Sequence, residues 1–240
     1  MVFGVTIWIK LPVATGSVSQ GNEMAGKRDY GQFCGLAAGL NIIGERWTLL
    51  LVRELLVSAL RFNELLDNLP GIGPNLLAER LRTLAEHGLV EQLAVVGDGR
   101  AKRYRLTERG QQLRGPVLGL ARWGMQFLSL DDRDGGEVRA EWGIIAVQAM
   151  VDTGRVPEVD EAYEFRVGEE TFGVFVDAGA VRFVPGPPVR AEVVVSSDPD
   201  TFIQIGAGMV SPFDALAAGQ IKLEGPAEAI RRCTRMLGLT

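Results

Sequence analysis

The 240-residue sequence contains only one histidine, His87, and two cysteines, Cys34 and Cys233. Two cysteines are too few for a disulfide scaffold or a four-cysteine zinc site, and one histidine leaves little material for histidine-rich metal sites or a catalytic triad. We find no nucleophile–base pair, paired carboxylates or phosphate-binding loop in a suitable context. The sequence therefore predicts no enzyme, no cofactor and no metal site.

Long apolar runs are also missing, because the longest is far shorter than the roughly 20 residues that span a bilayer. The apolar start, residues 1–9, lacks a basic n-region, and no convincing cleavage site follows it. These features predict a soluble cytoplasmic protein without a signal peptide, a transmembrane helix or a membrane partner.

Residues 1–27 differ from the rest of the chain because their apolar start is followed by a Gly/Ser/polar run over residues 15–22. Such a run is a poor candidate for packing. We expect either a disordered arm or an extension in front of a natural start at Met24.

The net charge of −5 is divided unevenly between the two halves. Residues 28–114 carry 12 Lys and Arg against 10 Asp and Glu, whereas residues 131–240 carry 10 against 19. The stretch from Arg100 to Arg109 holds five basic residues and one acid, which is the densest positive patch. A basic first module that contacts a polyanion and an acidic second module that does not would explain this division, although the patch also fits a solvated hairpin.

Residues 28–130 show the periodicity of a mainly α domain that ends in a basic hairpin and one more helix. A Gly-Asp-Gly-Arg turn, residues 97–100, separates the two strands, and Thr107 is suited to cap the last helix. The predicted helices cover residues 30–42, 47–55, 62–69, 74–87 and 108–127, and the strands cover residues 91–96 and 102–106.

This order predicts a winged helix-turn-helix, in which the helix from Pro74 to His87 can enter a DNA major groove. Leu77, Leu81 and Leu84 would face the core, while Tyr104 and Leu106 would point inward from the second strand of the wing. The candidate DNA-binding residues lie on the opposite faces and around the turn: Arg61, Asn63, Pro74, Asn75, Glu79, Arg80, Arg82, Arg100, Lys102, Arg103 and Arg105.

Residues 131–139 form the clearest linker, and residues 140–240 predict an α+β domain with an antiparallel or mixed five-stranded sheet. A helix over residues 142–150 comes first. Strands over residues 163–167, 171–176, 180–184 and 191–196 follow, then two helices that begin at Pro199 and Pro212, a strand over residues 220–223 and a helix from Pro226.

The first half resembles the HxlR-type winged-helix transcription regulators, relatives of the MarR group, over about 40% of the chain. The matching segments are Ile43–Leu51, Arg61–Leu65, Leu69–Ile72, Leu81–Leu84, Gly88–Val90, Tyr104–Gly110 and Trp123–Gly124. The resemblance implies a cytoplasmic homodimer on a pseudo-palindromic double-stranded DNA operator, with dimer contacts from the first and last helices. Gly73 stands where members often have Ser, but glycine also serves at an N-cap.

Cys34 lies where many of these regulators carry a cysteine, which in some of them senses oxidants or electrophiles. Its neighbours in the sequence are apolar, and a thiol in apolar surroundings has a raised pKa and reacts poorly. We therefore expect a packed structural cysteine. For His87 we expect a helix-capping role, and for Trp47 and Trp123 a place in a core or an interface.

The second half resembles the sterol-carrier-protein type 2-like domain, mainly over residues 191–229. The resemblance implies a five-stranded sheet covered by helices, with an apolar cavity between them. For any single candidate lining residue, a place in the ordinary core is favoured over a place in the cavity wall, and in other proteins the domain is a non-catalytic accessory. The candidates are Phe165, Phe175, Phe183, Phe202, Ile205, Met209 and Phe213.

The leading functional prediction is a sequence-specific DNA-binding regulator modulated by an apolar small molecule in the second domain. One alternative is a lipid- or hydrophobe-binding protein whose winged helix mainly dimerises. Another is a redox-sensing regulator that acts through Cys34 and has a structural C-terminal domain.

Overall fold

The computed structural model describes residues 29–95, 98–128 and 141–239 of the chain. The chain divides into two compact units, residues 1–41 and residues 42–240. The predicted extension over residues 1–27 and the predicted linker over residues 131–139 lie outside the described residues. The domain boundaries derived from the sequence therefore stay predictions.

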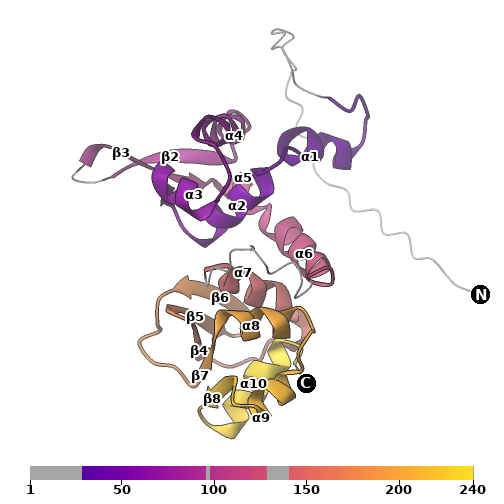
Figure 1. Cartoon of the computed structure of the whole chain (residues 1–240), viewed down its shortest axis with the longest axis vertical. Helices are drawn as coiled ribbons and strands as arrows, with labels where there is room; N and C mark the ends of the chain where they lie inside the picture. Colours follow the sequence, from indigo (N-terminus) through magenta and orange to yellow (C-terminus); the bar gives the residue numbers. More distant parts are fainter. Residues whose placement is uncertain (1–28, 96–97, 129–140, 240) are drawn as a thin grey trace, which may run out of the picture. The chain divides into compact units, whose positions relative to one another are not determined.

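The first part of the fold is helical and ends in a β-hairpin and a further helix pair (Figure 1). We call residues 48–125 the winged-helix module. In chain order the elements are α1 (Gly35–Ile43), α2 (Thr48–Val57), β1 (Leu60–Arg61), α3 (Phe62–Asn68), α4 (Pro74–Glu86), β2 (Val90–Val95), β3 (Asp98–Leu106), α5 (Glu108–Gln111) and α6 (Arg114–Met125).

Helix α1 begins at Gly35 instead of residue 30, strand β3 begins at Asp98 instead of residue 102, and two further elements differ from the prediction. Strand β1 joins the hairpin in a sheet of order β1-β3-β2, and at two residues it is too short to show a period-2 pattern. The predicted last helix is two helices, because α5 ends at Gln111 and α6 begins at Arg114. Pro116 cannot donate a backbone hydrogen bond, so it fits the first turn of a new helix better than the middle of a long one.

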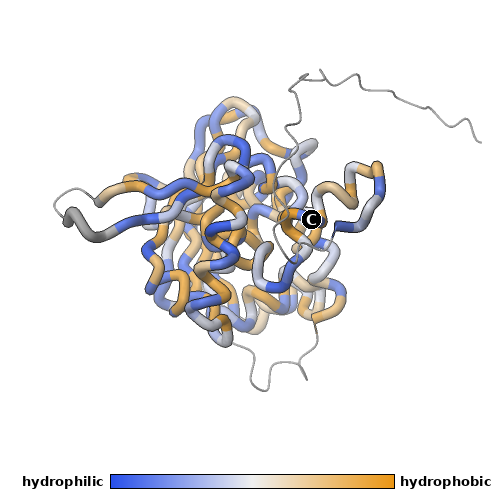
Figure 2. The backbone as a smooth tube through the Cα atoms, turned by 90° about the horizontal axis from the view of Figure 1, so that it is seen from above, coloured by the Kyte–Doolittle hydropathy of each residue, from blue (hydrophilic) through white to orange (hydrophobic). Residues whose placement is uncertain are grey.

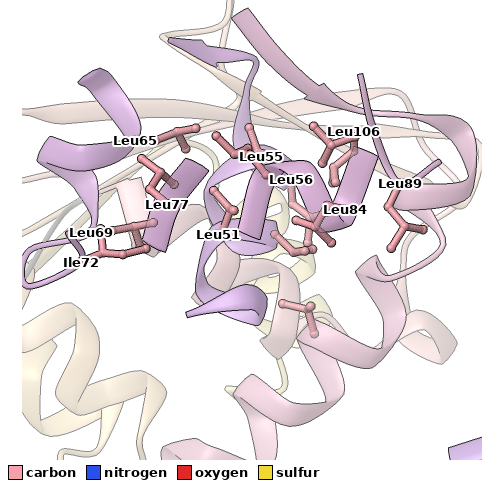
Figure 3. Packing of buried hydrophobic residues seen from close by; sticks show 14 of the residues in the cluster. Leu51, Leu55, Leu56, Leu65, Leu69, Ile72, Leu77, Leu84, Leu89 and Leu106 are labelled. Carbon is pink, nitrogen blue, oxygen red and sulfur yellow. The ribbon is translucent and has the colours of Figure 1, made fainter. Parts of the chain in front are cut away.

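The core of the winged-helix module is built mainly from leucines on α2, α3 and α4, as Figure 3 shows. Leu77, Leu81 and Leu84 of α4 are buried, as their helical spacing predicts. Leu106 closes the core from the wing sheet. Burial of such side chains is the main force that holds the short helices together.

The C-terminal module, residues 141–239, is an α+β structure around a five-stranded mixed sheet, which confirms the predicted fold class. Strand order is β6-β5-β4-β7-β8, with β4 and β7 parallel and the other neighbours antiparallel. Its elements are α7 (Glu141–Met150), a 3₁₀ turn (Thr153–Arg155), β4 (Glu161–Val167), β5 (Glu170–Asp177), β6 (Ala180–Pro185), β7 (Val193–Ser197), α8 (Pro199–Gly206), α9 (Pro212–Ala217), β8 (Ile221–Glu224) and α10 (Ala227–Met236).

One face of this sheet is apolar, and helices of the same module pack on it (Figure 1). Tyr163, Phe165 and Val167 of β4 are buried on that face because side chains alternate along a strand. The Phe165 and Phe172 rings stack there at 5.2 Å between centroids. On the opposite face, Arg182 lies over the Phe175 ring at 4.5 Å from its centroid.

The two modules share buried contacts within the unit of residues 42–240. Ile145 of α7 belongs to the winged-helix core, while Ile144 and Val147 of the same helix belong to the core of the C-terminal module. Arg122 of α6 adds polar contacts, since its guanidinium donates to the carbonyl oxygens of Ala149 at 2.5 Å and Val151 at 3.1 Å. Helix α7 therefore links the two modules.

We predict that Gly110→Ala destabilises the winged-helix module. A Cβ at Gly110 would lie 2.1 Å from the carbonyl oxygen of Leu89, which is backbone and cannot rotate away. The free energy of unfolding should fall by about 1–3 kcal/mol, measured by urea denaturation followed by circular dichroism.

Gly115→Ala is the matched control, because no atom lies within 4 Å of a Cβ at this helical glycine. This substitution should raise the free energy of unfolding by about 0.5–1 kcal/mol. Equal urea midpoints for the two variants would contradict the packing described for Gly110.

Candidate functional site

Helix α4 has one buried face and one polar face that is open to solvent. Leu77 and Leu84 are 0% exposed, whereas Asn75, Glu79 and Arg82 are exposed. Pro74 is exposed at the first turn of the helix, and Gly73 takes the N-cap position in an extended conformation. The sequence pattern thus placed the two faces of α4 correctly.

Arg80 differs from the other candidates on α4, because its guanidinium is engaged inside the fold. It bonds Glu79 at 2.9 Å and Glu45 at 3.3 Å, and it donates to the carbonyl oxygen of Arg46 at 3.2 Å. Only 12% of its side chain is exposed. These contacts tie the N-terminal side of α2 to α4, a structural role that helical spacing alone cannot reveal.

The residues around α3 are placed by a local hydrogen bond. Arg61 precedes the helix, and its backbone N–H donates to Glu64 Oε2 at 2.6 Å, which fixes the start of α3. Arg61 is half-buried and Asn63 is exposed. Arg61 thus lies at the N-cap of α3, and Asn63 lies in the first turn of that helix.

The wing exposes its cations as strand alternation predicts, and hydrophilic residues mark much of the hairpin that projects at the left of Figure 2. Arg105 pairs with Glu91 at 2.7 Å, and Arg103 donates to the carbonyl oxygen of Ala59 at 3.1 Å. Tyr104 is half-buried and Leu106 is buried, as predicted. The side chain of Arg100 lies outside what the structure describes.

Two of the candidate cations stand apart from the others. Among the side chains that the structure describes, neither Arg82 nor Lys102 has an ion pair or a hydrogen-bond partner, and both are exposed. Cations in this state can neutralise phosphates without first giving up an internal partner. The exposed face of α4 and the wing therefore form a surface with available positive charge.

A separate apolar cavity of about 240 Å³ lies in the C-terminal module, between the sheet and its helices. Phe165, Phe202, Ile205 and Phe213 line it, as predicted. Helix α7 and helix α10 also contribute to the wall, and the sequence analysis did not include their residues. These further lining residues include Val147, Met150, Ile230, Cys233 and Leu237.

Three predicted lining residues are not part of this cavity. Phe175 lies on the opposite face of the sheet beneath Arg182, because it is one residue out of step with Phe172 and Val174. Phe183 lines a different cavity, next to Arg114. Met209 lies beyond the end of α8 and is half-buried outside the lining. Strand alternation would have separated Phe175 from the others.

The environment of Cys34 contradicts the predicted packed thiol. Cys34 is exposed at the start of α1, and the backbone N–H groups of Ala37 and Leu36 lower its pKa. Cys233 is the opposite case, since burial raises the pKa of its thiol to about 12. Sequence neighbours are a poor guide here because the groups that act on the sulfur are backbone amides.

Within residues 29–95, 98–128 and 141–239, no cluster of three or more His, Cys, Asp or Glu residues could hold a metal ion. In the same part of the chain, no helix combines the length and the apolar character that a membrane crossing requires.

The fold and the α4–wing surface define a winged helix-turn-helix protein that carries an additional α+β module. The chain belongs to the HxlR-like helix-turn-helix family, whose model matches residues 42–132. Residues 148–238 match the SCP-2 sterol transfer family.

Curated relatives resemble the first half of the chain. An uncharacterized HTH-type transcriptional regulator of Mycobacterium tuberculosis is 42% identical over 89 residues, which are 37% of this chain and 56% of that protein. The regulator YvaP of Bacillus subtilis is 31% identical over 37% of this chain and 82% of its own length. The solved structure of the oxidized redox regulator HypR is 29% identical, with a TM-score of 0.38, over 40% of this chain and all of HypR.

The chain spans about half the length of the mycobacterial relatives that it matches. The similarity to curated relatives therefore concerns the winged-helix module.

Proposed function

We propose that the protein is a sequence-specific DNA-binding transcription regulator. The observation that carries this proposal is the exposed polar face of α4, with Arg82 unpaired among the described side chains and Lys102 on the adjacent wing. Asn and Arg are suited to base edges in the major groove, and an exposed Lys on the wing is suited to phosphate. The relatives named as HTH-type transcriptional regulators support the same activity.

The regulator acts as a homodimer in this proposal. Helix α6 and the residues after it carry a strip of exposed apolar side chains: Leu120, Trp123, Phe127 and Leu128. Trp123 is 59% exposed, and its ring packs edge-on against Phe127 at 4.7 Å between centroids. An apolar strip of this kind is costly in water, and a second copy of the chain would cover it. Two symmetry-related α4 helices then suit a pseudo-palindromic operator.

An apolar small molecule bound in the 240 Å³ cavity is the effector in this proposal. Val147 and Met150 of α7 form part of the cavity wall, so an occupant contacts α7 directly. Arg122 of α6 donates to carbonyl oxygens at the end of α7 and next to it. Since α6 also carries the exposed apolar strip, a ligand that prefers one position of α7 favours one dimer geometry and changes operator affinity.

For DNA binding, the prediction concerns Arg82→Ala. If Arg82 contacts a base, specific binding should weaken by about 1–3 kcal/mol, a loss of roughly 5- to 150-fold in affinity. The measurement is fluorescence anisotropy with a duplex from upstream of the protein's own gene, against a scrambled duplex, at two salt concentrations.

Arg190→Ala is the matched control, because it removes the same charge from an exposed residue of the C-terminal module. Its affinity should stay at the wild-type level. Wild-type affinity in Arg82→Ala would remove Arg82 from the interface. Absence of binding to either duplex would favour the alternative of a hydrophobe-binding protein that uses its winged helix to dimerise.

For the effector, the prediction uses the uncharged fluorescent probe N-phenyl-1-naphthylamine. The wild-type protein should bind it with increased fluorescence, and Leu223→Trp should abolish binding, because Leu223 lines the cavity from the edge strand β8. Lys222→Trp places the same side chain at an exposed neighbour outside the lining and should bind normally.

The same probe tests the coupling. It should change the affinity of the wild-type protein for its operator but not that of Leu223→Trp. Arg122→Met should keep probe binding and lose the effect on DNA, because it removes both hydrogen bonds to α7. A probe that binds the wild type and leaves DNA affinity unchanged would refute the effector role.

A second candidate is a thiol switch, which the exposure and the lowered pKa of Cys34 favour. We predict that iodoacetamide alkylates Cys34 with a pH midpoint below the ordinary thiol value of about 8.5, because the thiolate is the reacting form. Mass spectrometry at each pH gives the rate. Cys233 in the same chain is the internal control and should stay unmodified while the protein is folded.

If the thiol regulates, diamide should change DNA affinity in the wild type and in Cys233→Ser but not in Cys34→Ser. A diamide response that persists in Cys34→Ser would exclude this candidate.

A further inference from the structure

A second cavity, of about 570 Å³, lies where the winged-helix module meets the C-terminal module within the unit of residues 42–240. The C-terminal end of α2, helices α6 and α7, and strand β6 contribute its walls. Leu118, Val151 and Phe183 make part of the wall apolar, while Arg114, Gln148 and Arg182 make part of it polar. Its volume falls in the range of small-molecule sites in proteins.

The charge of this cavity is opposite to that of the sequence around it. Among its described lining residues, Arg114 holds its charged group at the cavity and no Asp or Glu is present, although residues 131–240 carry 19 acidic residues against 10 basic ones. The Arg182 guanidinium lies over Phe175 on the other face of the sheet, so Arg114 supplies the positive potential of the cavity. A cavity next to an acidic module whose described lining holds a cation and no carboxylate provides a place for an anion.

Arg114 is the central residue of this wall. Its guanidinium donates to Gln148 Oε1 at 2.7 Å, Gln111 Oε1 at 3.0 Å and the carbonyl oxygen of Leu56 at 3.2 Å. All three acceptors are neutral, and no carboxylate among the described side chains forms an ion pair with Arg114. Burial lowers the pKa of Arg114, which means that its charged form is destabilised by lost hydration. No counter-ion among the described residues offsets that loss.

We propose that this cavity binds a small organic carboxylate with an apolar body. The carboxylate accepts hydrogen bonds from Arg114, which neighbouring side chains already hold in place. The hydrocarbon part of the ligand packs against Leu118, Val151 and Phe183. This site differs in place and in chemistry from the apolar cavity beneath α8 to α10, which is lined almost entirely by apolar side chains.

The probe pair 4-phenylbutyrate and 4-phenylbutanol tests the proposal, because the two molecules differ mainly in the charged group. Isothermal titration calorimetry with the full chain should show the acid binding at least roughly tenfold more tightly than the alcohol. Arg114→Met should remove this preference, and Arg114→Lys should keep part of it. A similar affinity for acid and alcohol in the wild type, or no binding of the acid, would overturn the proposal.

A second pair of variants keeps the test valid if Arg114→Met folds poorly. Ala180 is exposed on the edge strand β6 and lines the cavity. Ala180→Glu adds a carboxylate that competes with the probe and should weaken binding of 4-phenylbutyrate at least roughly tenfold. Ala180→Gln has the same shape without the charge and should bind as the wild type does. Binding that survives Ala180→Glu but is lost in Leu223→Trp would place the probe in the apolar cavity and refute the proposal.

Discussion

Helix α7 buries side chains in two hydrophobic cores at once, and the junction of the winged-helix module with the C-terminal module depends on this. Its sequence, Glu-Trp-Gly-Ile-Ile-Ala-Val-Gln-Ala-Met, is apolar on nearly every side. A helix of this composition is stable in water only when neighbours cover it all round. Ile145 inserts on the side of the winged-helix core, and Ile144 and Val147 insert on the side of the sheet. Neither module alone would cover both sides.

Polar contacts at both ends of α7 fix its position, which apolar packing alone would leave less determined. At the first turn, the indole N–H of Trp142 donates to Glu54 Oε1 at 3.0 Å, and Arg53 lies over the Trp142 ring at 4.1 Å from its centroid. Glu54 is only 3% exposed, so its carboxylate needs these partners. At the other end, the guanidinium of Arg122 donates to the carbonyl oxygens of Ala149 and Val151. Directional bonds at two separated points oppose both sliding and rotation of the helix.

The sequence was informative wherever periodicity and burial coincide. It predicted the order of α2, α3 and α4, the two faces of α4, the inward Tyr104 and Leu106, and the α+β class of the second half. In each case a buried face gives a periodic pattern of apolar residues in the sequence. Strand β1 was missed, since two residues cannot show a period. The break between α5 and α6 was also missed, although Pro116 was a usable signal.

The site was harder to predict than the fold, because site properties depend on contacts between distant segments. Arg80 and Arg82 are two residues apart and equally basic, yet only Arg80 meets Glu45 and the carbonyl oxygen of Arg46 from the segment before α2. The exposure of Cys34 depends likewise on what packs against it, and apolar sequence neighbours do not report that. Phe183 was assigned to the correct face of its strand but to the wrong cavity, because no pattern in the sequence divides that face between two hollows.

The apolar cavity and the cavity that holds Arg114 are bordered by different residues of the same short helix, α7. Ile144 and Gln148 of α7, with Val151 just after it, line the cavity that holds Arg114, while Val147 and Met150 of α7 line the apolar cavity. An occupant of either cavity therefore contacts α7, whose end bonds to Arg122 on the helix that carries the exposed apolar strip. If both proposed ligands bind, a ligand that prefers one position of α7 would change the affinity of the other cavity for its own ligand. The buried helix that joins the modules is thus, among the described elements, the one that borders both cavities and bonds to α6 of the winged-helix module.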